Sequence, residues 1–256
     1  RSCLRRLVSE GLFDRVGDGR GRAACFAATP RGFQFLARER DRLRRARAIG
    51  RGEAPWDGRW HLVAFAIPEA VRAARDAFRE RLRSLGGAAL HGGLYVSAYP
   101  WEVSVRSAAK DLAVSAHLTL ATSPDLEIAG EGESQIVARR LWPLALVAAS
   151  YSSFLDRFRE APARLAAIRD RGQVLPDEAF LPAALSMAVE WGRCFEADPL
   201  LPPELLPGSW PGLEAHELLV TVRRLALALR EAQGRPPLFH AIDDIFEDAV
   251  DRPIST

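Results

Sequence analysis

The fold of this 256-residue chain is decided by residues 60–98, which read WHLVAFAIPEAVRAARDAFRERLRSLGGAALHGGLYVSA. Residues 60–67 form a short apolar run that is typical of a buried strand, and residues 68–85 repeat apolar side chains at the spacing of an amphipathic helix. The side chains that we expect this helix to bury are Val71, Ala74, Phe78, Leu82 and Leu85.

The segments that follow complete a known order of elements. Short strands are expected at residues 88–91 and 94–98, on either side of a Gly-Gly turn. A helix from Trp101 to about Ser115 then leads to a strand at residues 117–122. This β-α-β-β-α-β order predicts a split βαβ, ferredoxin-like domain.

On the N-terminal side, the pattern predicts a helix, a hairpin and a second helix. Residues 2–10 suit a short helix with a basic face, and residues 13–16 and 22–28 suit two strands around a glycine-rich turn. Thr29-Pro30 is typical of an N-cap followed by proline at the first helical position, and opens a helix that runs to about Ala48.

Downstream of residue 130 the pattern is helical, with a proline-rich loop before the last elements. The expected helices span residues 134–141, 143–160, 163–171, 178–196, 214–232 and 238–250.

Charge is distributed unevenly along the chain. The net charge is +2, yet residues 1–60 contain 15 arginines and 7 acidic residues, which gives +8 and leaves −6 for residues 61–256. Lys110 is the only lysine. Arginine keeps its charge and pairs bidentately with phosphate, although GC-rich coding would give the same bias. A basic head on an acidic body predicts a nucleic-acid-binding end and a different role for the rest.

The basic helix and hairpin fit the second half of a winged helix-turn-helix, in which one helix enters the major groove and the wing contacts the backbone or minor groove. A solvated basic helix and loop is the alternative reading of the same pattern. The candidate DNA-binding residues are Arg1, Ser2, Arg5, Arg6, Arg20, Arg22 and Arg31.

The sequence does not indicate a membrane protein, a disulfide framework or a metal site. The longest apolar stretch, residues 141–149, is interrupted by Pro143 and is far shorter than the roughly 20 residues of a membrane helix. With no apolar signal segment, we expect a cytoplasmic protein without membrane contact. The three cysteines are far apart, and the scattered histidines, His61 among them, are interpreted as packing residues. We therefore expect no metal, no cofactor and no catalytic residue.

The ferredoxin-like domain raises one enzymatic alternative, a metal-dependent nuclease. Small RNases of this fold place an acidic residue near the end of the first strand, where this chain has Ala66. Glu69 is better explained as an acidic residue in the first turn of a helix. Glu69 and Asp111 would be the residues to change in a test of nuclease activity.

A candidate effector site lies on the expected helix 178–196, where Glu190, Trp191 and Arg193 fall together. An arginine and a tryptophan beside a helical cavity could hold an anionic, aromatic or acyl ligand. A half-buried tryptophan beside a surface ion pair is the alternative. Arg59 and Trp60 complete the set of candidate effector residues.

Three groups of motifs, in order along nearly the whole chain, resemble one known family. They are residues 1–12 (RSCLRRLVSEGL) with 28–32 (ATPRG), residues 56–63 (WDGRWHLV) with 67–69 (IPE), and residues 198–207 (DPLLPPELLP) with 210–212 (WPG). The family that they resemble is that of the phenylacetate-degradation repressors, the PaaX-type regulators.

The resemblance implies a one-component transcriptional repressor that binds double-stranded operator DNA and is released by a CoA thioester, phenylacetyl-CoA in characterised relatives. Residues 189–193 depart from the family, because Val-Glu-Trp-Gly-Arg stands where a His-Glu-aromatic-Arg-Arg run is common. The resemblance also implies that the chain starts inside the recognition helix, so that two preceding helices are absent from it.

We therefore expect an α+β protein that is a repressor and not an enzyme, with a homodimer as its assembly. Its expected domains are a partial winged helix at residues 1–49, a ferredoxin-like dimerisation domain at 56–130 and a helical, effector-binding domain at 131–256. The alternatives are the nuclease and a module that binds a CoA ligand without any role on DNA.

Overall fold

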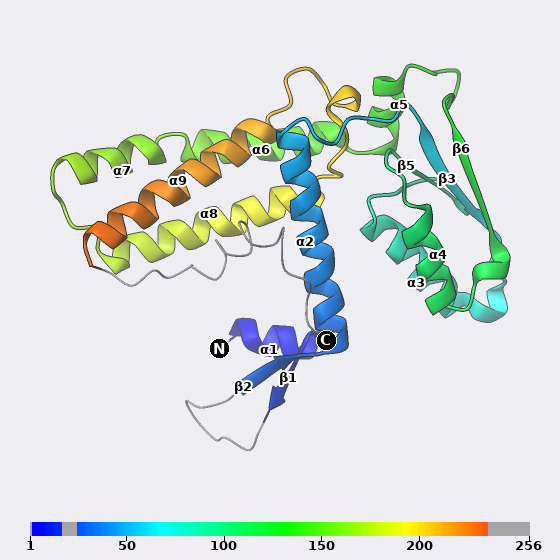
Figure 1. Ribbon diagram of the computed structural model, residues 1–256, viewed down its shortest axis with the longest axis horizontal. Coiled ribbons are helices and arrows are strands. Elements are labelled where there is room, and N and C mark those ends of the chain that lie inside the picture. Colours follow the sequence, from blue (N-terminus) through cyan, green and yellow to red (C-terminus); the bar gives the residue numbers. More distant parts are fainter. Residues whose placement is uncertain (1, 17–24, 235–256) are drawn as a thin grey trace. The chain divides into compact units, whose positions relative to one another are not determined.

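The computed structural model describes residues 2–16 and 25–234 (Figure 1). These residues form two compact units, one ending at Arg51 and the other beginning at Gly52. The predicted strand residues 22–24 and the helix expected at 238–250 lie outside the described residues.

The N-terminal unit has the predicted order of helix, hairpin and helix. Helix α1 (Ser2–Ser9) is followed by the antiparallel strands β1 (Phe13–Val16) and β2 (Cys25–Ala28), and then by helix α2 (Pro30–Gly50). Thr29 is the N-cap of α2, since its Oγ1 accepts a hydrogen bond from the Gly32 amide at 3.0 Å. The N-cap predicted from Thr29-Pro30 is confirmed.

The second unit contains a four-stranded antiparallel sheet in the order β4-β5-β3-β6. Its strands are β3 (Trp60–Phe65), β4 (Ala88–His91), β5 (Leu94–Ser97) and β6 (Leu118–Ser123). The first strand in sequence is central, and its neighbours are the third and fourth strands. This order confirms the predicted split βαβ topology and the α+β class.

Helices α3 (Arg72–Ser84) and α4 (Glu102–Asp111) pack on one face of the sheet, with a short 3₁₀ helix, η2 (Ser115–His117), before β6. Phe78 and Leu82 are fully buried there, as predicted. Val71 was predicted to be buried, but it is 44% exposed. The reason is that residues 69–71 form a separate 3₁₀ helix, η1 (Glu69–Val71), so the α-helical spacing does not reach back to this residue.

The rest of the second unit is helical. It comprises α5 (Ser134–Leu141), α6 (Leu144–Phe158), α7 (Ala161–Asp170), α8 (Asp177–Ala197), the 3₁₀ helix η3 (Pro203–Leu205) and α9 (Gly212–Ala232). In Figure 1, α6 and α7 follow one another while α8 and α9 run alongside them. One apolar cluster, centred on Tyr151 and Phe154, joins α6, α8 and α9, and a second joins α7, α8 and α9 around Phe180.

A tryptophan cluster joins the sheet to the helical region. Trp60, at the start of β3, is 1% exposed; its ring stacks on Trp142 with centroids 6.4 Å apart and lies 5.2 Å from that of Trp56. Leu201 and Leu205, from the loop after α8, pack into the same cluster. The sheet and the helical region are therefore parts of one packed unit.

Candidate functional site

The N-terminal unit exposes arginines on its helices. Arg5 and Arg6 are exposed on α1, and Arg6 Nε donates to Glu10 Oε1 at 2.7 Å in a solvated i,i+4 pair. Such a pair is worth about 0.3–0.5 kcal/mol, so a phosphate can displace it at little cost. Arg31, in the first turn of α2, is exposed, and its Nη1 lies 3.9 Å from where a Cβ on Gly11 would be. Arg31 thus reaches the end of the helix that carries Arg5 and Arg6.

Hydrogen bonds from the side chain and the backbone of Thr29 connect the end of α1 to the start of α2. Thr29 Oγ1 donates to the Gly11 carbonyl at 2.7 Å, while the Thr29 amide donates to the Leu12 carbonyl at 3.0 Å. A Cβ at Gly32 would lie 2.0 Å from the Leu12 oxygen, so only glycine allows this approach. The arginines are therefore presented by a defined scaffold, as a helix that docks on DNA requires.

Not every predicted DNA-binding residue can be placed. Arg1, Arg20 and Arg22 lie outside the described residues, and of Ser2 the structure describes only its helical backbone. Sequence analysis did not single out the arginines of β1 and of α2 after its first turn. These have described and at least partly exposed side chains: Arg15, Arg40, Arg42, Arg44, Arg45 and Arg47. The high number of arginines along α2 was the feature of the sequence that could have indicated them.

The five predicted effector residues occupy two separate places. Arg59 is exposed next to Trp60, whose ring is buried in the tryptophan cluster and offers no surface to a ligand. Glu190, Trp191 and Arg193 lie together on α8, where Trp191 packs against the apolar cluster of Tyr151 and Phe154. Trp210 packs against both clusters. A single ligand site that joins all five residues is not formed.

On α8, Glu190 is held by a cation from the neighbouring helix. Arg157 of α6 donates to Glu190 Oε1 and also to Ser186 Oγ, the latter at 3.1 Å. Trp191 is half-buried among Tyr151, Phe154, Phe195 and His216, with ring centroids 5.6–5.9 Å away. Arg193 is exposed. This geometry matches the alternative to an effector site, namely a half-buried tryptophan beside a surface ion pair.

An ionic cluster that sequence analysis missed lies at the start of β3. The buried His61 places Nδ1 2.6 Å from Glu102 Oε1 and Nε2 3.0 Å from Asp57 Oδ2. His61 therefore links two acidic side chains, one from the segment before β3 and one from the start of α4. Burial acts to raise the pKa of Glu102, but hydrogen bonds from His61 and from the backbone outweigh it and leave that pKa below its usual value.

The residues considered for the nuclease alternative either form other contacts or lie in separate elements. Ala66 follows β3 and donates its amide to the His117 carbonyl at 3.1 Å. Glu69 accepts from Arg75 at 2.7 Å, and Asp111 ends α4 on the surface. Within residues 2–16 and 25–234, no group of three or more His, Cys, Asp or Glu side chains is arranged to hold a metal ion. In the same ranges no helix is both long and apolar enough to cross a bilayer.

Comparisons with known proteins place these features in context. Two family models match the chain: the PaaX protein central Cas2-like domain, over residues 53–137, and the PaaX-like protein C-terminal domain, over residues 142–232. Both matches lie in the second unit.

A curated relative and a solved structure are also similar to this chain. The chain is 25% identical over 225 residues to the transcriptional repressor PaaX of Escherichia coli (strain K12), an alignment that covers 87% of this chain and 66% of the relative. The chain thus spans just under two thirds of that repressor's length. An uncharacterized protein from Mycobacterium tuberculosis has a solved structure with a TM-score of 0.46 and 23% identity, over 91% of this chain and 83% of that one.

Proposed function

Because this chain belongs to the PaaX family, we propose that it is a DNA-binding transcriptional repressor of an aromatic catabolic operon, released from DNA by a CoA thioester. The observation that carries the proposal is the exposed arginine set of the N-terminal unit, Arg5, Arg6 and Arg31, on helices that hydrogen bonds from Thr29 hold together. The family relation supports the regulatory role, and the arginines support DNA as the partner.

The arginine set suits a groove of DNA for electrostatic and geometric reasons. An α-helix fits the major groove, where arginine reads guanine bidentately, and neighbouring arginines neutralise phosphates. In this reading Arg5 and Arg6 contact bases or phosphates from α1, while Arg31 contacts a phosphate beside the same helix. Arg1, Ser2, Arg20 and Arg22 belong to the same proposed surface by their place in the sequence. A homodimer would present two such surfaces to a two-fold operator.

The effector part of the proposal needs cations that can meet the phosphates of a CoA thioester. Arg59 and Arg193 are exposed and can do so. Trp191 offers an aromatic edge within the α6–α8 cluster for an aryl or acyl group, next to Glu190. Trp60 would act only through packing. Release of the DNA requires that the ligand prefer one conformation, and a coupling of about 1–3 kcal/mol would lower operator affinity roughly 5- to 150-fold.

The test is a DNA-retardation titration of the full-length protein with the region upstream of its own gene, at several salt concentrations. Affinity should fall linearly on logarithmic axes as salt rises, since bound arginines release counterions. Arg5→Ala and Arg6→Ala should each weaken binding about tenfold, and a residue that contacts phosphate should also lower the salt slope by about one. Phenylacetyl-CoA should reverse the retardation.

Arg164→Ala is the matched control, because Arg164 is an exposed arginine on α7 of the other unit and its loss changes the net charge equally. It should leave the retardation unchanged. Salt-insensitive binding, or equal effects of Arg164→Ala and Arg5→Ala, would contradict the proposal. Retardation that no CoA thioester reverses would remove the effector part and leave the DNA-binding part standing.

A further inference from the structure

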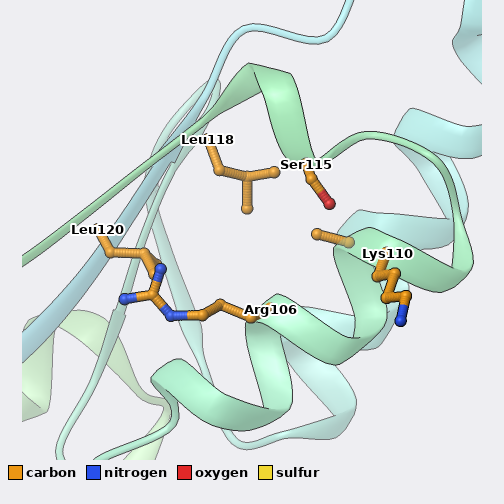
Figure 2. Close-up of a pocket in the computed structure, with 6 residues that line it drawn as sticks. Arg106, Lys110, Ser115, Leu118 and Leu120 are labelled. Atoms are coloured by element: carbon orange, nitrogen blue, oxygen red, sulfur yellow. The ribbon is translucent and has the colours of Figure 1, made fainter.

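A pocket of about 480 Å³ lies between α4 and the edge strand β6, away from all five predicted effector residues (Figure 2). It is lined by Arg106, Ala109, Lys110, Ser115, Leu118 and Leu120. Arg106 and Lys110 are four residues apart and therefore share one face of α4. Leu118 and Leu120 alternate along β6 and share the sheet face of Phe65 and Val63, with which they pair in register.

The floor of this pocket is apolar. Leu118 and Leu120 are half-buried at the edge of the core beneath α3 and α4, and Ala109 is 2% exposed. The wall carries positive charge: Figure 2 shows Arg106 extending towards Leu120, while the side chain of Lys110 points away from Leu118 and Leu120. The ammonium of Lys110 is on a flexible four-carbon stem, which can turn over the pocket.

The two cations of the pocket differ from those of the neighbouring helix. On α3, Arg72, Arg75 and Arg79 form ion pairs with Glu69 or Asp76 at 2.7–3.8 Å. In the described part of the chain, neither Arg106 nor Lys110 has a carboxylate at ion-pair distance.

Two like charges at this spacing destabilise a helix by about 0.2–0.5 kcal/mol. Lys110, in the last turn of α4, offsets the helix dipole there. Arg106 lies in the middle of α4, so the helix dipole does not explain a positive charge at this position.

We propose that this pocket binds a small organic anion, in which one carboxylate or phosphate group is attached to a compact apolar body. Arg106 would hold the anionic group by charge-assisted hydrogen bonds, and Lys110 would join it once its side chain turns over the opening. Leu118 and Leu120 would receive the apolar body, and Ser115 would offer a hydroxyl at the rim. The volume is in the range of small-molecule sites, which combine an apolar lining with few polar groups. Binding here can be measured without DNA.

Calorimetric titration of the whole chain with three probes distinguishes the possible sources of the anion. Phenylacetate supplies a carboxylate on an apolar ring, phenyl phosphate supplies a phosphate on the same ring, and inorganic phosphate supplies charge alone. Saturable binding of phenylacetate or of phenyl phosphate, tighter than that of inorganic phosphate, supports the proposal and identifies the anionic group. Binding of all three with equal affinity would mean an adventitious ion only, and no heat at about 10 mM ligand would exclude even millimolar affinity.

The variants Arg106→Gln and Lys110→Gln should each weaken binding of the successful probe about tenfold, because a charge-assisted hydrogen bond is lost. Arg81→Gln on α3, also exposed and with the same charge change, is the control and should leave affinity unchanged. Both target residues are exposed, so the fold should persist, and circular dichroism verifies this. Equal affinities in all three variants would overturn the assignment.

Lys110 also offers a direct readout, since it is the only lysine of this chain. Reductive ¹³C-methylation labels its ammonium together with the amino terminus. The Lys110 resonance should move on titration with the bound probe, and the amino-terminal resonance should not. A stationary Lys110 resonance at saturation would exclude the lysine from the site.

Discussion

The substitution His61→Phe tests the ionic cluster at the start of β3. Phenylalanine keeps a planar ring of similar size in a side-chain site that is 6% exposed, so the change removes polar contacts and leaves little cavity. It also leaves Glu102 and Asp57 facing an apolar ring. The change should therefore destabilise the second unit through lost hydrogen bonds and a stranded charge.

The magnitude follows from the two contacts. A hydrogen bond to a charged group contributes about 1.5–3 kcal/mol. The bond to Glu102 counts nearly in full, because it is 2.6 Å long and that side chain is 26% exposed. The bond to Asp57 is discounted to less than about 1 kcal/mol, since that side chain is 38% exposed and solvent screens it. We expect a loss of about 2–4 kcal/mol in the free energy of unfolding.

The assay is urea unfolding followed by tryptophan fluorescence, because Trp56 and Trp60 flank the cluster. The midpoint should fall while the slope with denaturant stays constant, as for a change in stability alone. Glu102→Gln in the wild-type background should cost about 1–2 kcal/mol. In the His61→Phe background the same change should be neutral or stabilising, because it then removes a charge that has no partner.

The pH dependence has a defined sign. Because the pKa of Glu102 is lowered in the folded state, its contribution to stability is present above its unfolded pKa and is lost as pH falls through the folded pKa. The stability difference between wild type and Glu102→Gln should thus be full near neutral pH and shrink below about pH 4. A His61→Phe effect under about 1 kcal/mol, or a second substitution that costs as much as in wild type, would refute this account.

Three further outcomes follow from other contacts. Gly32→Ala should destabilise the N-terminal unit by more than about 2 kcal/mol in thermal unfolding, because the new Cβ would lie 2.0 Å from the Leu12 carbonyl oxygen; an unchanged transition would contradict this. Asp177→Asn should cost more stability than Arg230→Met, since the first leaves an arginine that is 1% exposed without its 2.6 Å anionic partner, and the reverse order would refute the argument. Cys194 should react with a thiol reagent only on unfolding, because burial, followed by the charge of a neighbouring carboxylate, raises its pKa; rapid labelling of the native chain at this position would disprove it.

Elements with local signals were predicted well from the sequence. Residues 134–141 form α5 as expected, and Trp142-Pro143 ends it where proline cannot continue the helix. The N-cap at Thr29 was visible because its side chain and the following proline act within one turn. The prediction that Val71 is buried was wrong, because hydrophobic spacing does not reveal that the chain passes through a 3₁₀ turn before it becomes α-helical.

Contacts between segments that are far apart in the sequence could not be predicted from local patterns. His61 was interpreted as a packing residue, which its burial supports, but its carboxylate partner Glu102 is 41 residues away. Only the folded sheet brings the start of β3 to the start of α4. The pocket residues Arg106 and Leu120 likewise belong to different elements, and no spacing in the sequence links them. The effector prediction joined Trp60 and Trp191, which the fold places in separate clusters.

The motifs that resemble the family are better explained as structural contacts between segments than as ligand sites. The Trp56 amide donates to Glu204 Oε2 at 3.2 Å, which ties the WDGRW segment to the PPEL segment. Asp198 accepts from the Tyr151 hydroxyl at 2.9 Å and from the Leu200 amide at 2.8 Å, in a turn where Leu200 has a left-handed φ of 53°. These residues stabilise the junction of sheet and helices.

Residues in these contacts are engaged with other parts of the chain and are less available to a ligand. We therefore expect ligand specificity to depend on residues outside these structural contacts. Two places meet that condition, the α6–α8 pair of Arg157 and Glu190, and the α4 pocket with Arg106 and Lys110. Calorimetry with wild type and Lys110→Gln separates them, because only the pocket contains a lysine.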